Sequence, residues 1–344
     1  MKRFNCGQCG SELFFENTRC LSCGADIGWD WTTLALRVLE PEAATHRRCA
    51  NVTQPNPCNA LIADGDPPGS FCWSCGFTEI APDLRLDVNR LRLSRLEDAK
   101  RRLLTQLRTF GLPVGEQDGS LPLRFRFLVP IEGQEPVITG HANGTITVDA
   151  LEADDEELHR RKQALDEKYR TVLGHLRHEV GHYYYALLVE RGNEVESFRA
   201  TFGDPEADYA ASIERHYAQG PPPNWPQSHV TAYASSHPWE DFAESWAHLL
   251  HITDALETAG AYSMSAAGVA MAEQDACSML DDMEKQLSNW QRLSIVLNAL
   301  ARGIGQPDPY PFALSPTVVG KICWIAALIR AAGLPEAPDP RNFR

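Results

Sequence analysis

Two histidines four residues apart, with a glutamate directly after the first, are the best candidates for chemistry in this chain. They lie in the stretch HEVGHYYY, residues 178–185. On a helix, His178 and His182 lie one turn apart on the same face, so both imidazoles can bind one cation. Glu179 lies one position round the helix, where it can accept a proton from an attacking water molecule. The pattern predicts a catalytic zinc site with Glu179 as general base; the alternative is a helix that carries two histidines without a metal.

A catalytic zinc ion needs a third protein ligand, and the stretch SSHPWEDFAESWAHLLHI, residues 235–252, offers the candidates. We expect Glu240 to bind the metal and Glu244, one turn later, to accept a hydrogen bond from a ligand histidine and hold its tautomer. Glu244 as the ligand, or His248 in an all-histidine site, are the alternatives. Tyr233, seven residues before Glu240, can donate a hydrogen bond to the oxyanion of a tetrahedral intermediate.

Eight of the ten cysteines fall within the first 75 residues, which predicts a separate N-terminal module. Pairs of the form CxxCG aim two thiolates at one point, and four thiolates complete one tetrahedral site. Zinc is the expected metal, although four sulfurs also accept iron; disulfides or free buried thiols are the alternatives. Such a site supplies about 10–16 kcal/mol of folding free energy to a segment too short to fold alone. The two predicted structural sites are Cys6, Cys9, Cys20 and Cys23, and then Cys49, Cys58, Cys72 and Cys75.

The remaining sequence predicts an α+β protein in which a mainly helical region with a small antiparallel sheet follows the cysteine-rich module. Leucines at helical spacing among many arginines predict an amphipathic connector helix, with a solvated basic face or a basic face that binds a partner. Alternating residues and the dipeptide Asn143-Gly144 predict strands joined by a hairpin turn. The expected strands cover residues 123–129 and 136–150; the expected helices cover 84–110, 155–189, 238–259 and 316–332.

Composition limits the classes of partner and compartment. The chain has 344 residues and a formal net charge of −14, which argues against a protein whose main partner is a phosphate backbone. The sequence has no apolar run of about 18 residues and no signal-peptide pattern at its start, so we expect no membrane span and a cytoplasmic protein.

HEVGH followed about sixty residues later by YASSHPWEDFAES is similar to the gluzincin class of zincin metallopeptidases, and the spacing Tyr-x6-Glu-x3-Glu resembles the anthrax lethal factor family. That resemblance implies the same roles for Tyr233, Glu240 and Glu244 as given above. With the CxxCG knuckles and the late YPFALSP, nearly the whole chain resembles bacterial zinc-binding metallopeptidases with an N-terminal zinc ribbon. It implies a zinc-ribbon module over 1–80, the connector over 81–118 and a zincin-like domain over 119–344. In zincins a peptide pairs with an edge strand, for which residues 144–155 are the candidate.

The leading hypothesis is a zinc-dependent peptidase with one catalytic and two structural zinc ions, acting on a peptide or protein substrate. The alternative hypothesis is a catalytically silent zincin-fold protein that binds or regulates a partner through its zinc ribbons. Protein is the expected partner of the ribbons, and nucleic acid is disfavoured by the acidic charge.

Overall fold

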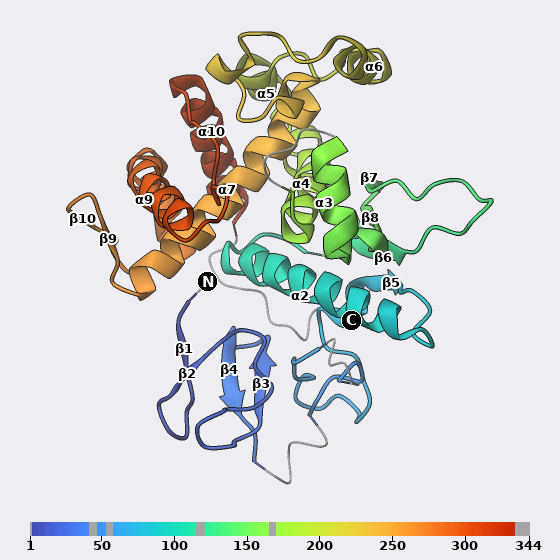
Figure 1. Cartoon of the computed structure of the whole chain (residues 1–344), viewed down its shortest axis with the longest axis vertical. Helices are drawn as coiled ribbons and strands as arrows, with labels where there is room; N and C mark the ends of the chain where they lie inside the picture. Colours follow the sequence, from blue (N-terminus) through green and yellow to red (C-terminus); the bar gives the residue numbers. More distant parts are fainter. Residues whose placement is uncertain (1, 41–46, 53–57, 115–120, 165–169, 334–344) are drawn as a thin grey trace. The chain divides into compact units, whose positions relative to one another are not determined.

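The computed structural model describes residues 2–40, 47–52, 58–114, 121–164 and 170–333, which form two compact units (Figure 1). The described residues of the N-terminal unit lie within Lys2–Leu165 and Thr171–Leu176, and those of the C-terminal unit are Arg170 and Arg177–Gly333. Cysteine-rich segments come first and a mainly helical region follows, so the predicted α+β class is confirmed. Among the described residues, no helix is both long enough and apolar enough to span a membrane.

The cysteine-rich part of the N-terminal unit consists of short strands and loops packed round aromatic rings. Strands β1 (Phe4–Asn5) and β2 (Glu12–Leu13) form one antiparallel pair, and β3 (Ile27–Asp30) and β4 (Ala35–Val38) form another. Trp29, on β3, is fully buried, and its ring contacts those of Phe15 and Trp31. Two-stranded pairs of this length are marginal alone, so a metal ion bound by the cysteines would stabilise such a segment.

Helix α2 (Asp87–Thr109) occupies the predicted connector, but part of its charged surface is buried. Glu97, Lys100 and Arg101 are each at most 1% exposed. The Lys100 ammonium pairs with Glu97 at 2.9 Å and lies over the rings of Phe125 and Phe127, while Arg101 pairs with a carboxylate one turn earlier. The expectation of a solvated face is therefore wrong for these residues, because α2 is packed between other parts of its own unit.

The main sheet has four strands in the order β5-β6-β8-β7 and is mixed. Strands β5 (Thr78–Ile80), β6 (Arg124–Leu128) and β8 (Thr145–Asp149) run parallel, and β7 (Gly140–Ala142) pairs antiparallel with β8. The predicted antiparallel sheet is thus wrong in this detail. The chain leaves β5 through the long helix α2 before it forms β6, and a helical crossover returns a chain in the same direction.

The predicted hairpin turn is confirmed, whereas the predicted edge strand is not. Asn143 and Gly144 join β7 to β8 with positive φ angles of 49° and 80°, as a two-residue hairpin turn requires. Strand β8 is the part of the candidate edge at residues 144–155 that forms a strand, and it pairs with β6 on one side and β7 on the other. It is an interior strand because the first half of its own hairpin covers its outer side.

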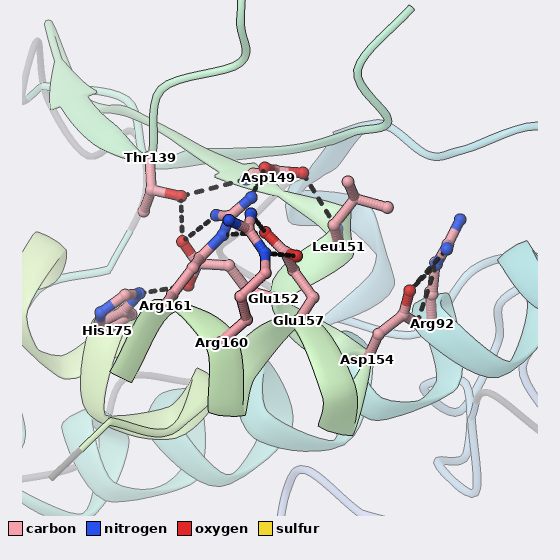
Figure 2. A network of polar contacts seen from close by, with 10 residues as sticks. All are labelled: Arg92, Thr139, Asp149, Leu151, Glu152, Asp154, Glu157, Arg160, Arg161 and His175. Carbon is pink, nitrogen blue, oxygen red and sulfur yellow. Dashed lines mark hydrogen bonds and ion pairs between the residues drawn. The ribbon is translucent and has the colours of Figure 1, made fainter. Parts of the chain in front are cut away.

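A polar network fixes the end of β8 to the elements that follow it (Figure 2). These are η2 (Ala150–Ala153), α3 (Asp155–Ala164) and the first turn of α4 (Val172–Tyr184). The Arg161 guanidinium pairs with the buried carboxylates of Asp149 and Glu152, and Thr139 donates a hydrogen bond of 2.9 Å to Glu152. The second oxygen of Glu152 contacts Nδ1 of His175. Each buried carboxylate therefore has a partner, as burial of a charge demands.

The C-terminal unit is built round one long helix, α7 (Pro238–Ala261), which is buried along most of its length. In Figure 1, α7 (orange) runs beside α9 (Met283–Gly303) and α10 (Pro316–Ala332), and the three helices are in contact. The proline at the first helical position, preceded by the capping His237, starts α7 where the sequence predicted it. The smaller elements are η3 (Tyr185–Glu190), α5 (Val195–Phe202), α6 (Tyr209–Gln219), η4 (Trp225–Gln227), η5 (Tyr233–Ser235), β9 (Ser265–Ala266), β10 (Val269–Ala270) and α8 (Ala276–Asp281).

The three tyrosines that follow HEVGH all pack into the core. Tyr183 and Tyr184 are fully buried and Tyr185 is 6% exposed. The ring of Tyr184 stacks on Trp246 of α7 with ring centroids 4.8 Å apart. At Tyr185 the α-helix changes to the π-helix η3, which turns the following residues away from the α-helical register. These rings thereby fix α4 to α7 just beyond the two histidines.

Candidate metal centre

The close approach of α4 to α7 depends on one glycine between the two histidines. A Cβ atom on Gly181 would lie 2.9 Å from Cα of Ala243 and 3.3 Å from its Cβ and its carbonyl oxygen. Any side chain at residue 181 would therefore hold the two helices apart. Since Gly181 precedes His182 by one residue and Ala243 follows Glu240 by three, this contact sets the distance between the histidines and the glutamate.

Three potential ligand atoms converge where the helices meet. Nε2 of His178 lies 3.0 Å from Oε2 of Glu240 and 3.2 Å from Nε2 of His182, which in turn lies 3.5 Å from the same glutamate oxygen. A tetrahedral zinc site with bonds of about 2.0–2.1 Å places its nitrogen and oxygen ligands about 3.3 Å apart. Oε2 of Glu240 is buried and makes no hydrogen bond of acceptable geometry to any described residue. The arrangement fits a cation held by three lone pairs.

Glu244 holds one of the two imidazoles from outside the metal site. Its Oε1 accepts a hydrogen bond of 2.7 Å from Nδ1 of His178, which leaves the lone pair of Nε2 facing Glu240. Its Oε2 accepts a second hydrogen bond of 2.7 Å from Oγ1 of Thr231. The same hydroxyl oxygen accepts a bond from the backbone N–H of Ala234. The carboxylate is thus held at both oxygens, and the ring of His178 has one orientation.

Glu179 adjoins His178 in the chain, and the ring of Tyr233 lies near that of His178. Glu179 follows His178 on α4 and is 8% exposed. The ring of Tyr233, on η5, has its centroid 6.0 Å from that of His178. Burial raises the pKa of the Tyr233 phenol, and the negative charge of Glu240 raises it further. Tyr233 therefore keeps its proton at neutral pH and can act as a hydrogen-bond donor.

Two further residues contact the candidate ligands and were missed by the sequence reasoning. Oη of Tyr209, at the start of α6, donates a hydrogen bond of 2.8 Å to Oε1 of Glu240. The ring of Trp239 lies against that of His182 with centroids 3.9 Å apart. Trp239 directly precedes the predicted ligand and could have been suspected from that position. Nothing in the spacing of Tyr209, 31 residues before Glu240, marks it.

The alternative ligand His248 lies elsewhere on α7. It is 4% exposed, and its Nδ1 lies 2.7 Å from Oη of Tyr310 in the YPFALSP stretch. The group of possible ligand atoms contains His178, His182 and Glu240 and does not include it. The structure therefore gives His248 a partner within the helical core.

The loop that carries Thr231 and Tyr233 is fixed to α7 by a lysine from near the C-terminus. Nζ of Lys321, on α10, donates to the carbonyl oxygen of Ser228 at 2.6 Å and pairs with the buried carboxylate of Asp241. Asp241 directly follows the glutamate that faces the two histidines. The buried ammonium group of Lys321 therefore joins the loop to α7.

The first cysteine group has the geometry of a tetrahedral thiolate site. In Cys6, Cys9, Cys20 and Cys23, sulfur atoms of different knuckles lie 3.7 and 3.8 Å apart, and all possible ligand atoms lie within 4.8 Å of one another. Zinc–sulfur bonds of about 2.3 Å place tetrahedral sulfurs about 3.8 Å apart, whereas a disulfide needs about 2.05 Å. Gly10 and Gly24, after each knuckle, have φ angles of 73° and 76°, as the predicted turn requires.

The second group, Cys49, Cys58, Cys72 and Cys75, is completely buried. The sulfurs of Cys58 and Cys72 lie 3.7 Å apart, and the backbone N–H of Cys72 donates to the sulfur of Cys49 at 3.2 Å. The carboxylate of Glu97, on α2, lies 4.0 Å from the sulfur of Cys75. The geometry of this group also fits a zinc ion. Unlike the first group, which is partly exposed, it lies among the buried charges of α2.

Comparisons with known proteins agree with these groups. A family model described as "Putative zinc-binding metallo-peptidase" matches residues 89–328, and one described as a zinc-ribbon domain matches residues 3–86. Uncharacterized proteins of Mycobacterium bovis and Mycobacterium tuberculosis are 39% identical over 332 residues, which cover 96% of this chain and 95% of theirs. No solved structure matches significantly.

Proposed function

The chain belongs to the family of zinc-binding metallo-peptidases, as its motifs indicated, and on that premise we propose that it hydrolyses peptide bonds. The observation that carries the proposal is the convergence of His178, His182 and Glu240, with ligand atoms 3.0–3.5 Å apart. The buried Glu179 directly follows His178 on α4. The gluzincin-like and lethal-factor-like spacing of Tyr233, Glu240 and Glu244 supports the same conclusion.

The residues of this site divide the work among them. When zinc is bound, it supplies the Lewis acidity that polarises the scissile carbonyl and lowers the pKa of a water molecule to about 7. Glu179 accepts the proton of the attacking water and returns it to the leaving amine. Tyr233, protonated at neutral pH, donates a hydrogen bond to the developing oxyanion. Glu244 holds the ring of His178 in its productive tautomer.

The cysteine groups complete the proposed metal content. Each of the two cysteine groups would hold one structural zinc ion, and the histidine site would hold a third. The protein would therefore bind about three zinc ions per chain. Elemental analysis should find about three zinc ions per chain in the wild type and about two in His178→Ala. Two ions in both proteins would favour the alternative, a catalytically silent protein that binds partners through its zinc ribbons.

The test of the mechanism is Glu179→Gln, assayed on a library of internally quenched peptides. The amide has the shape of the carboxylate but cannot accept the proton, so turnover should fall about 10²–10⁴-fold while zinc content stays at the wild-type value. Glu190→Gln, the same change at an exposed residue eleven positions further along, is the matched control and should keep full activity. Wild-type turnover by a zinc-loaded Glu179→Gln protein would exclude this mechanism.

A further inference from the structure

One hydrogen bond from a surface helix reaches the glutamate of the metal centre. Helix α6 is exposed along most of its length, and Ser212 is the residue of α6 that is buried. Tyr209, at its first position, is 41% exposed, yet its hydroxyl lies 2.8 Å from Oε1 of Glu240, which is 1% exposed. The cap residue Asp208 fixes the start of this helix by accepting a bond from the N–H of Ala211.

The two oxygens of Glu240 have different surroundings. Oε2 faces Nε2 of both His178 and His182, at 3.0 and 3.5 Å. Oε1 is turned towards Tyr209 and is held by its hydroxyl. A free carboxylate can offer both of its oxygens to a metal, so the direction in which Oε1 is held decides whether one or two oxygens are available.

Two ring contacts help to keep Tyr209 in place. Its ring centroid lies 5.3 Å from that of His237 and 5.6 Å from that of Trp239. His237 also contacts the carbonyl oxygen of Ala207 through Nε2 at 3.0 Å, which fixes the residues before α6 to the start of α7. The phenol is therefore held against the start of the ligand helix, although the rest of α6 is exposed.

We propose that Tyr209 is a positioning residue, which holds Oε1 of Glu240 so that Oε2 alone is presented beside the two histidines. The inference rests on the proposed function, since it assigns the coordination of that same site. By occupying one oxygen, Tyr209 keeps a coordination position open for water or substrate, which a catalytic zinc site requires.

The protonation of Tyr209 is consistent with this role. Burial raises the pKa of its phenol, and the charge of Glu240 raises it further, so the hydroxyl remains a donor over the neutral pH range.

The variant Tyr209→Phe tests the proposal, because it keeps the ring contacts and removes the hydroxyl. Tyr262→Phe, at 43% exposure in the same unit, is the matched control. In each protein the most easily removed zinc ion is exchanged for cobalt, and the visible absorption spectrum is recorded. The spectrum of identically treated His178→Ala is subtracted from each to remove the contribution of the cysteine sites. In Tyr209→Phe we expect weaker visible absorption, as a second glutamate oxygen raises the coordination number, and a metal dissociation constant that rises about 10–100-fold.

The outcomes separate the two proposals. A cobalt spectrum of Tyr209→Phe that matches those of the wild type and Tyr262→Phe would overturn the positioning role, even if the variant were less stable, because a merely structural role leaves the coordination unchanged. If the wild type itself gave no cobalt signal above that of His178→Ala, the proposed function would be refuted, and this inference with it.

Discussion

Replacing Gly181 by alanine should push apart α4 and α7, the two helices that carry the proposed ligands. The new methyl group would lie 2.9 Å from Cα of Ala243, whereas comfortable carbon contacts are about 3.5–4.0 Å. The obstacle is backbone, which cannot rotate away like a side chain. The helices must therefore separate by roughly 0.5–1 Å, which moves Glu240 away from the histidines it faces at 3.0 and 3.5 Å.

The expected energies follow from two opposing effects. Overpacking at a helix contact costs about 1–3 kcal/mol. Alanine in place of glycine inside a helix regains about 1 kcal/mol, so the net loss is at most about 2 kcal/mol. Gly320, inside α10 of the same unit, has nothing within 4 Å of an added Cβ, and Gly320→Ala should gain about 0.5–1 kcal/mol. The two variants should therefore differ by about 1–3 kcal/mol, and zinc affinity should fall about tenfold or more in Gly181→Ala alone.

Urea unfolding followed by circular dichroism measures the difference in stability between the two variants. Competition with a chromogenic chelator measures the difference in zinc affinity. Both variants make the same chemical change in a helix, so helix propensity cancels in the comparison. If Gly181→Ala were as stable as Gly320→Ala and bound zinc as tightly as the wild type, the conclusion that this glycine sets the spacing of the ligands would be wrong.

Two more predictions concern buried polar partners. Thr231→Val removes the hydroxyl that donates to Glu244, so the dissociation constant for zinc in a chelator competition should rise up to about tenfold; an unchanged value would show that Glu244 needs no second partner. Lys100→Met leaves the carboxylate of Glu97 buried without its cation near the sulfur of Cys75, and urea unfolding should show a loss of about 3–5 kcal/mol. Glu97→Gln added to Lys100→Met should recover part of this loss, and a loss below about 1 kcal/mol in the single variant would contradict the assignment.

The sequence itself determined the features that depend on neighbours along the chain. The i, i+4 spacing of His178 and His182 places them on one helical face whatever surrounds the helix. Each CxxCG pair brings its own two sulfurs together, and Asn143-Gly144 accepts the positive φ angles of a tight hairpin turn. These are local properties, because a few dihedral angles decide them.

Only the tertiary structure decided what meets across larger distances along the chain. It brought Glu240 to the histidines, gave His248 a different partner, and added Tyr209 from an exposed helix that no periodicity had marked. It also buried the charges of α2 and placed β8 inside a mixed sheet, where the sequence predicted a solvated face and an edge strand. The physical reason is that the partners of a side chain depend on which segments pack together, and close contacts such as that of Gly181 with α7 decide that packing.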